Sequence, residues 1–518
     1  MSSKSQYLYL KQSPWAGYSG VASKPSVLRC AAASARMTMD LNGHYQLHID
    51  GESVPASTDD ALVTNDPATG EPIARFATAT TADVDRAVDA AREALSAWRS
   101  KTPVERGQIL QTVATQIRAN ADDLARIESR DQGKPLTQAQ SDVEDAVRYF
   151  EYYAGAADKL EGKSVPRGDE TLDMTVREPY GVSGQIIPWN FPLSITARGV
   201  APALAAGNTV VVKPAPTTPL SALHLAALCR DAGVPDGVVN VVTGGTEPGV
   251  ALTSHDGVDQ LTFTGSVPTG RAVMKAAAET ITPVTLELGG KNPAIVMPDA
   301  DLDEAAFWIA TGIFTNAGQI CSAADRALVH ESIYDEFVEL LVDHAASYEL
   351  GPGTDDPDMG PLNHAEHFET VVDYIETGLE EGATLETGGE PLDGDGHFVP
   401  PTVFSDVEPE MQIAQEEIFG PVLAVIPFAD RAEAIEIANG VEFGLTGGVF
   451  SRDVAQALGM ARDIDAGGVY VNEWFGGSIE TPFGGMKQSG IGREKGLEAL
   501  DSYLQTKNIA VNLDEDGH

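Results

Sequence analysis

The stretch Thr209-Val210-Val211-Val212-Lys213 decides the fold class of this chain. Its three successive β-branched apolar residues are typical of a short buried strand. Strands are also expected at 181–187, 238–242 and 260–264, with helices at 221–232, 249–254 and 271–280. Short apolar strands that alternate with helices predict an α/β fold with a parallel, doubly wound sheet.

A second unit of the same kind begins near residue 286. Its expected strands are 294–296, 423–426 and 447–450, and its expected helices are 303–314 and 332–345. Upstream of the first unit, strands are expected within 45–49 and 71–76, and long helices at 81–98, 103–132 and 142–159. Residues 160–179 are polar and extended, which indicates an excursion away from the core.

The charge balance is strongly acidic. Asp and Glu total 77 against 34 Lys and Arg, for a net charge of -43 in 518 residues. The acids are spread along the chain, which indicates an acidic surface throughout, as in a salt-adapted cytosolic protein. Such a surface disfavours binding to nucleic acid.

The cysteines Cys30, Cys229 and Cys321 form no CxxC pair, so neither a metal site nor a disulfide framework is expected. A reducing cytoplasmic location fits this usage. No apolar run is long enough to span a bilayer, so no membrane partner is expected.

The N-terminal segment differs from the rest. It is free of acids up to Asp40 and carries Met37 and Met39 just before the change in composition. We therefore expect residues 1–38 to be a disordered extension or a mis-assigned start.

A phosphate site is suggested by Gly265 and Gly270, which follow an expected strand and open an expected helix. Backbone N–H groups and the positive end of the helix dipole would face an anion there, and Ser266 adds a hydroxyl donor. Lys213 ends another strand, at the sheet edge where ligands bind in such folds. A lysine that merely caps a strand in solvent is the alternative interpretation.

The chemistry centres on Cys321, in the loop FTNAGQICS at 314–322, where Gly318 allows close backbone approach. Taken alone, this cysteine is more often structural than nucleophilic. Asn190 could stabilise an oxyanion, and Glu287, flanked by leucines, could activate water with a pKa raised by its apolar surroundings. The alternatives are a turn asparagine and a structural acid.

Seven ordered motifs resemble those of the aldehyde dehydrogenase superfamily, across residues 45–511. They are PWNFP at 188–192, KPA at 213–215, FTGS at 263–266, LELGGK at 286–291, GQIC at 318–321, EEIFGP at 416–421 and PFGGMKQSG at 482–490. A match of seven motifs in order overrides the separate alternatives for each residue.

The resemblance implies a role for each matched residue. Cys321 would be the nucleophile, Asn190 and the Cys321 N–H would bind the oxyanion, and Glu287 would be the general base. NAD or NADP would be the cofactor, with Glu417 on the nicotinamide ribose and Phe419 near the nicotinamide ring. The implied cofactor contacts are Ile187, Pro188, Trp189, Lys213, Gly245, Gly249, Gly265, Ser266, Gly270, Leu288, Glu417 and Phe419.

The implied domains are a dinucleotide-binding domain at 40–159 with 180–289 and a catalytic domain at 290–491. Residues 160–179 and 497–518 would form a small β oligomerisation element, which gives homodimers or homotetramers. At position 216, where many family members have a ribose-binding glutamate, this chain has Pro216. The lost carboxylate leaves NADP as plausible as NAD.

Glu287 favours hydrolysis to a free acid over transfer to coenzyme A. The substrate would be a semialdehyde, of the 2,5-dioxopentanoate or succinate semialdehyde type, or alternatively betaine aldehyde. The expected entrance residues are Phe191, Ser194, Phe314, Ile320, Ser322 and the segment 474–478, where Trp474 and Phe475 form either an apolar wall or internal packing. The alternative outside enzymes is a catalytically silent family member with a structural role. Such a protein would be expected to lack Cys321 or Glu287.

Overall fold

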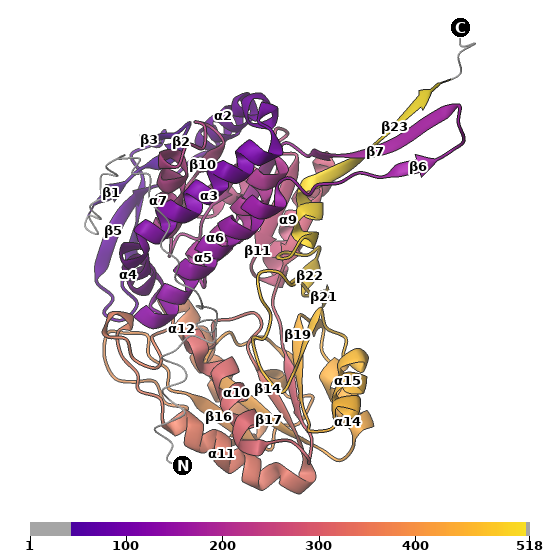
Figure 1. The fold of residues 1–518 in the computed structure, drawn as a ribbon. Coiled ribbons are helices and arrows are strands. Elements are labelled where there is room, and N and C mark those ends of the chain that lie inside the picture. Colours follow the sequence, from indigo (N-terminus) through magenta and orange to yellow (C-terminus); the bar gives the residue numbers. More distant parts are fainter. Residues whose placement is uncertain (1–42, 514–518) are drawn as a thin grey trace, which may run out of the picture.

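The computed structural model describes residues 43–513. The expectation for residues 1–38 and the position of Cys30 lie outside this range, as do residues 514–518 of the expected oligomerisation element. Two large sheets dominate the molecule, each covered by helices (Figure 1). The predicted pair of doubly wound α/β units is therefore confirmed.

The first sheet has eight strands with a parallel centre. Their order is β22 (Gly490–Ile491), β12 (Val284–Glu287), β11 (Gln260–Thr264), β8 (Val182–Ile186), β9 (Thr209–Lys213), β10 (Val239–Val241), β2 (Leu47–Ile49) and β3 (Glu52–Val54). Side chains of β9 alternate between two cores, because successive residues of a strand point to opposite faces. Val210 and Val212 pack into one core, and Val211 packs into the other.

Helices cover both faces of this sheet. The face of Val210 carries α3 (Pro103–Ala119), α4 (Ala121–Gln132), α5 (Leu136–Ala156), α6 (Pro192–Ala206) and α7 (Leu220–Asp231). The face of Val211 carries α2 (Thr81–Ser100), α8 (Thr246–Thr253) and α9 (Val267–Thr280).

The second sheet has seven strands, which run parallel except for β15. Their order is β15 (Thr384–Thr387), β16 (Thr402–Ser405), β17 (Val422–Phe428), β14 (Arg326–His330), β13 (Pro293–Val296), β19 (Thr446–Phe450) and β20 (Gly468–Val471). Its helices are α10 (Leu302–Phe314), α11 (Tyr334–Ala346), α12 (Ala365–Glu381), α13 (Gln412–Gln415), α14 (Arg431–Asn439) and α15 (Val454–Asp463).

Residues 160–179 leave the core, as expected. They form β6 (Ser164–Pro166) and β7 (Thr171–Pro179), and β7 pairs along its whole length with β23 (Leu504–Asn512). The three strands project from the body as a narrow arm (Figure 1). The assembly role of this arm stays a prediction. A small sheet of β1 (His44–Tyr45), β5 (Pro72–Ala77) and β4 (Ala61–Asn65) and a pair of β18 (Phe443–Gly444) with β21 (Met486–Lys487) complete the strands.

The prediction of a single long helix at 103–132 is wrong, because this segment forms two helices, α3 and α4, that meet at Asn120. The backbone of Asn120 leaves helical geometry, and its side chain donates a hydrogen bond to the carbonyl of Gln116 at 2.8 Å. This local bond competes with continuation of the helix. Strand β12 was not expected at all, although Glu287 ends it. Among residues 43–513, no helix combines the length and the apolar character that crossing a membrane requires.

Candidate functional site

The Cys321 loop follows α10 and begins with a tight turn over Thr315–Gly318. Asn316 and Ala317 have left-handed backbone conformations, and Gly318 has φ 73. A Cβ on Gly318 would lie 2.1 Å from the carbonyl oxygen of Gly420, so only glycine fits there. The loop brings Cys321 to a half-buried position. Burial raises the pKa of the Cys321 thiol to about 12, against the opposing charge of Arg198.

Asn190 lies against this loop, just before α6 begins. Its side-chain amide donates to the carbonyl of Gln319 at 2.9 Å, two residues before Cys321. An amide nitrogen has two donor hydrogens, so one remains for another acceptor. The backbone N–H of Cys321 has no acceptor among residues 43–513. The structure thus brings two free donors to the neighbourhood of the thiol, which suits a developing oxyanion.

Glu287 is the last residue of β12 and is 2% exposed. Neither of its carboxylate oxygens has a hydrogen-bond partner in the described part of the chain. Burial, and next the nearby charge of Glu494, raise the pKa of Glu287 well above its ordinary value, while Arg198 opposes the shift. Gly484 leaves room for the Glu287 side chain, because a Cβ at position 484 would stand 2.7 Å from Oε1 of Glu287. An acid whose oxygens have no hydrogen-bond partner and whose pKa is raised by burial contrasts with the capped or salt-bridged acid that the alternative interpretation requires.

A charged cluster beside these residues was missed by the sequence reasoning. Arg198 lies on α6, whose residues are all buried, and its Nε is 2.5 Å from a carboxylate oxygen of Glu494. Arg198 and Lys495 stand 5.5 and 5.3 Å from the centroid of the Phe483 ring. Both cations lower the pKa of Cys321, behind the larger opposing effect of burial. Arg198 is the only charged residue of α6, which was a signal available in the sequence.

The expected phosphate end lies at the carboxyl edge of the first sheet. Lys213 is 8% exposed, and burial lowers its pKa to about 8. The N–H of Ile187 donates to the carbonyl of Lys213 at 3.0 Å, so both residues lie at this edge. The aliphatic chain of Lys213 is 4.0 Å from the Cβ position of Gly249, and the Cβ position of Gly245 is open. Gly245 precedes α8 directly, which leaves its N-terminus accessible to a phosphate group.

The second helix N-terminus beside this edge belongs to α9. Ser266 precedes it, and its hydroxyl donates to Thr269 at 3.1 Å rather than to the helix backbone. Gly270 lies inside the helix, where a Cβ would be 2.6 Å from Leu288. Close packing against Leu288 therefore explains the glycine at position 270. The helix begins at Val267, before Gly270, and not at 271 as expected. Gly265 similarly packs on the ring of Phe263.

The nicotinamide end is expected at Glu417 and Phe419. A carboxylate oxygen of Glu417 accepts from the N–H of Gly290 at 3.0 Å, and burial raises the pKa of Glu417 to about 8. Phe419 has a left-handed backbone, with φ 59, and its ring meets Trp189 edge-on at 5.3 Å. His367 supports this turn by a 2.8 Å hydrogen bond to the Phe419 carbonyl. Ile187, Pro188 and Trp189 follow β8 of the first sheet, and Glu417 and Phe419 precede β17 of the second sheet. The residues predicted to bind the nicotinamide end therefore come from both sheets.

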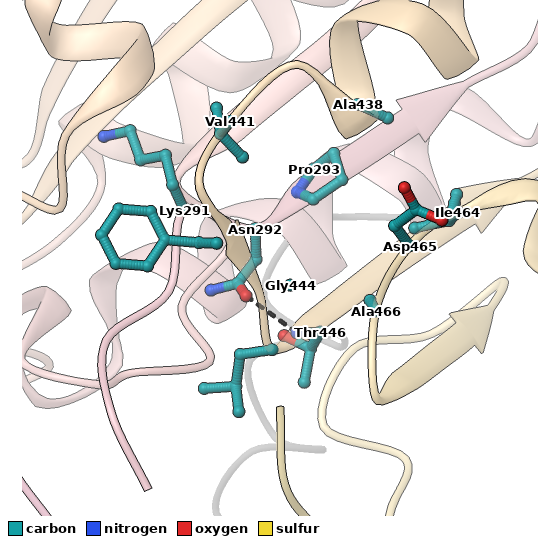
Figure 2. A pocket seen from close by; sticks show the side chains of 12 residues that line it. Lys291, Asn292, Pro293, Ala438, Val441, Gly444, Thr446, Ile464, Asp465 and Ala466 are labelled. Atoms are coloured by element: carbon teal, nitrogen blue, oxygen red, sulfur yellow. Dashed lines mark hydrogen bonds between the residues drawn. The ribbon is translucent and has the colours of Figure 1, made fainter. Parts of the chain in front are cut away.

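Asn292 ties the Cys321 loop to the second sheet and was given no role by the sequence reasoning. Its side-chain amide donates to the carbonyls of Cys321 and Ala323 at 2.9 and 2.8 Å. Its side-chain oxygen accepts from the N–H of Thr446 at 3.0 Å (Figure 2). The cavity beside it, about 10 Å³, has room for no more than one water. The hydrogen bonds of Asn292 are therefore those of a residue that supports the Cys321 loop.

Trp474 is not part of an exposed entrance. It is 1% exposed, and its indole N–H donates to the carbonyl of Ser322 at 3.0 Å. The packing interpretation of this residue is therefore the correct one. No group of three metal-binding side chains occurs among residues 43–513.

Comparison with known proteins agrees with this geometry. The model of the aldehyde dehydrogenase family matches residues 54–509. Hydroxyisobutyraldehyde dehydrogenase of Mycolicibacterium austroafricanum is 45% identical over 472 residues, which cover 90% of this chain and 94% of that protein.

Two solved structures are similar along nearly their whole length. An aldehyde dehydrogenase from Bacillus cereus in complex with NAD+ has a TM-score of 0.91 and 43% identity, covering 92% of this chain and 98% of that one. Betaine aldehyde dehydrogenase from Staphylococcus aureus has a TM-score of 0.89 and 39% identity, covering 91% and 95%.

Proposed function

The chain belongs to the aldehyde dehydrogenase family, and we propose that it oxidises an aldehyde to the carboxylic acid through a thioester on Cys321. The predicted enzyme class, an NAD(P)-dependent aldehyde dehydrogenase, is confirmed by these matches. The observation that carries the proposed chemistry is the convergence of Cys321, Asn190 and Glu287. They come from a loop of the second sheet, the start of α6 and the end of β12.

In the first step, the thiol of Cys321 gives its proton to water, and the resulting thiolate sulfur adds to the aldehyde carbon. The carbonyl oxygen becomes negative and accepts hydrogen bonds from Asn190 and the Cys321 N–H. NAD or NADP, when bound, supplies the two-electron acceptor. Glu287 then takes a proton from the water that attacks the thioester, which releases the acid and frees the thiol.

The residues at the sheet edge fit a dinucleotide. Lys213 offers a nearly buried amine, and its side chain lies beside Gly249 of α8. The helices α8 and α9 both begin without a side-chain cap hydrogen bond, which leaves backbone N–H groups for a phosphate. Trp189 and Phe419 would flank the nicotinamide, and Glu417 would hold its ribose. Because Pro216 supplies no carboxylate to repel a 2′-phosphate, we propose that the enzyme accepts NADP as well as NAD.

We propose a semialdehyde that carries a carboxylate, of the 2,5-dioxopentanoate or succinate semialdehyde type, as the substrate. Arg198 and Lys495 place two cations near the thiol, and Arg198 forms an ion pair with Glu494. The carboxyl groups of Glu287 and Glu417 also lie near the thiol. Buried cations favour a carboxylate, which guanidinium groups bind strongly. A trimethylammonium group needs a free aromatic face, and both cations already stand near the ring of Phe483.

We also propose a homodimer or homotetramer joined through the β6–β7–β23 arm, in a salt-adapted cytoplasm. The arm exposes both of its outer strands, whose unpaired backbone groups are a template for pairing. The net charge of -43 favours high ionic strength, which screens the repulsion among surface acids.

The test is steady-state turnover of an aldehyde panel at high salt, with NAD and with NADP, for wild type and Arg198→Met/Glu494→Gln. The double change removes both charges, so no unpaired ion stays buried. A lost charge-assisted hydrogen bond of about 1.5–3 kcal/mol predicts a roughly 10- to 150-fold lower kcat/KM for semialdehydes.

Turnover of neutral aldehydes should change much less. Arg148→Met is the matched control, because Arg148 pairs with Glu480 at the surface. Preference of wild type for betaine aldehyde, or equal losses for all aldehydes, would refute the carboxylate assignment.

A further inference from the structure

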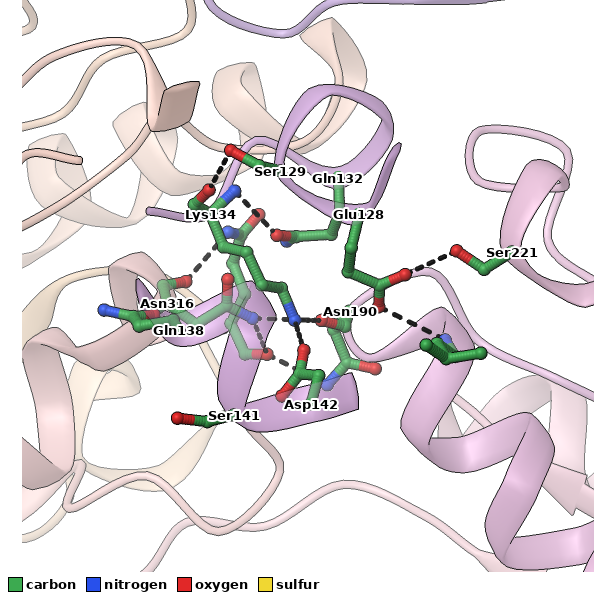
Figure 3. Close-up of polar contacts among 12 residues, drawn as sticks. Glu128, Ser129, Gln132, Lys134, Gln138, Ser141, Asp142, Asn190, Ser221 and Asn316 are labelled. Carbon is green, nitrogen blue, oxygen red and sulfur yellow. Dashed lines mark hydrogen bonds and ion pairs between the residues drawn. The ribbon is translucent and has the colours of Figure 1, made fainter. Parts of the chain in front are cut away.

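A buried ionic cluster lies directly behind Asn190 and takes no part in the chemistry described above (Figure 3). Its centre is Lys134, in the short connection between α4 and α5, which is 1% exposed. The Lys134 ammonium forms an ion pair with Asp142 of α5 and donates to the backbone carbonyl of Asn190 at 3.0 Å. It also stands 4.0 Å from the centroid of the Phe191 ring.

These contacts use the whole donor capacity of the ammonium. A lysine has three N–H groups, and here one faces a carboxylate, one a carbonyl and one an aromatic ring. A buried charge is costly unless it is paired in this way. Asp142 is 5% exposed, and burial raises its pKa even though Lys134 opposes the shift. The ion pair and its contacts to residues 190 and 191 therefore form one unit.

The first turn of α5, just after this connection, contacts the turn that precedes Cys321. The side-chain oxygen of Gln138 accepts from the N–H of Asn316, in the turn before Cys321. The amide of Asn316 donates to the Asn190 carbonyl at 3.1 Å, so this carbonyl has two donors. With its carbonyl fixed by Lys134 and Asn316, and its side-chain amide fixed by Gln319, residue 190 has one orientation relative to the thiol.

We propose that Lys134, paired with Asp142, is a positioning residue that fixes the amide of Asn190 for the oxyanion. This inference rests on the proposed function, since it requires Asn190 to act as an oxyanion donor. Lys134 does not touch the substrate. It acts through the peptide carbonyl of Asn190, and Asp142 compensates its charge.

The test is the single-turnover rate of cofactor reduction, which reports the step in which the oxyanion forms. Lys134→Met should lower this rate about 10- to 100-fold, less than the roughly 10²- to 10³-fold cost of deleting an oxyanion donor. The KM for NAD or NADP should not change. Lys134→Met/Asp142→Asn removes both charges together and carries the test if the single variant does not fold.

A double-mutant cycle with Asn190→Ala separates positioning from general damage. If Lys134 acts through Asn190, its substitution should slow the Asn190→Ala enzyme by less than about twofold. Alkylation of Cys321 by iodoacetamide should proceed at the wild-type rate, because this reaction forms no oxyanion. Thr64→Val is the matched control: it removes a buried hydrogen bond to Asp131 on α4 and should leave the single-turnover rate unchanged.

The two proposals fail in different ways. A folded Lys134 variant with the wild-type rate, or additive losses in the cycle, would refute the positioning role. An Asn190→Ala enzyme with the wild-type rate would instead refute the oxyanion role of Asn190, and with it the proposed mechanism.

Discussion

Glu287→Gln should stop turnover while making the folded protein more stable. Glutamine has nearly the shape of glutamate but cannot take a proton from water. Loss of a general base costs about 10²- to 10⁴-fold. Formation of the thioester does not need a base for water, so one equivalent of reduced cofactor should still appear and the acyl group should stay on Cys321.

The gain in stability follows from the two unpartnered oxygens of Glu287 and from its raised pKa. Above the ordinary value of 4.5, the unfolded chain releases this proton, while the folded protein still holds it. The folded state then binds more protons, so wild-type stability falls as pH rises from 4.5 towards the folded pKa. This loss is up to about 1.4 kcal/mol for each pH unit in that window, and the glutamine variant does not suffer it.

The assay combines rapid-mix absorbance, intact-protein mass and thermal unfolding at several pH values in one salt concentration. We expect a burst without steady turnover, a mass shift equal to the acyl group, and a Tm advantage over wild type that appears above about pH 4.5 and grows with pH. Turnover above a tenth of the wild-type rate would contradict the role of general base. A variant less stable than wild type at pH 8 would contradict the interpretation of Glu287 as an unpartnered buried acid.

Three further predictions follow from single residues. Because the thiol pKa is about 12, alkylation of free Cys321 should speed up about tenfold per pH unit between about pH 7 and pH 10, and a plateau within that range would contradict this. Pro216→Glu should raise the KM for NADP at least about tenfold and spare NAD, because the new carboxylate repels a 2′-phosphate; equal kinetics with both cofactors would contradict this. Gly270→Ala should cost about 1–3 kcal/mol in thermal unfolding, since its Cβ would stand 2.6 Å from Leu288, whereas Gly155→Ala, with no atom within 4 Å, should not destabilise.

The sheets could be predicted because their central strands are buried on both faces. Residues 209–213 and 260–264 are strands with the predicted bounds, and both are continuous runs of strand-forming residues. Strand β12 was missed because only four residues pair, and its end merges with the turn that carries Gly289 and Gly290. The break at Asn120 was missed although the sequence carries a signal for it: asparagine is common at helix ends, and Asp122 and Asp123 follow in the first turn of α4.

The reacting residues could be proposed because each stands in a motif with its own spacing. The residues that hold them in place could not. Three of these supporting residues are Lys134, Arg198 and Asn292, each a single charged or polar residue in a separate segment. Because most charged and polar residues lie at the surface, nothing in the sequence indicated that these three are buried. Only the fold shows that each is buried and which backbone carbonyl or carboxylate it meets.

The resting site favours the neutral forms of both reacting groups. Burial is the largest cause of the raised pKa of Cys321 and of Glu287, and each group would raise the pKa of the other further once ionised. A protonated thiol resists oxidation and premature alkylation, because the thiolate is the reactive form. The two ionisations are therefore best separated in time, with Cys321 losing its proton before the thioester forms and Glu287 acting only after the sulfur has become neutral again. Arg198 and Lys495 favour this order, since both stabilise the thiolate and their charges persist after acylation to stabilise the carboxylate.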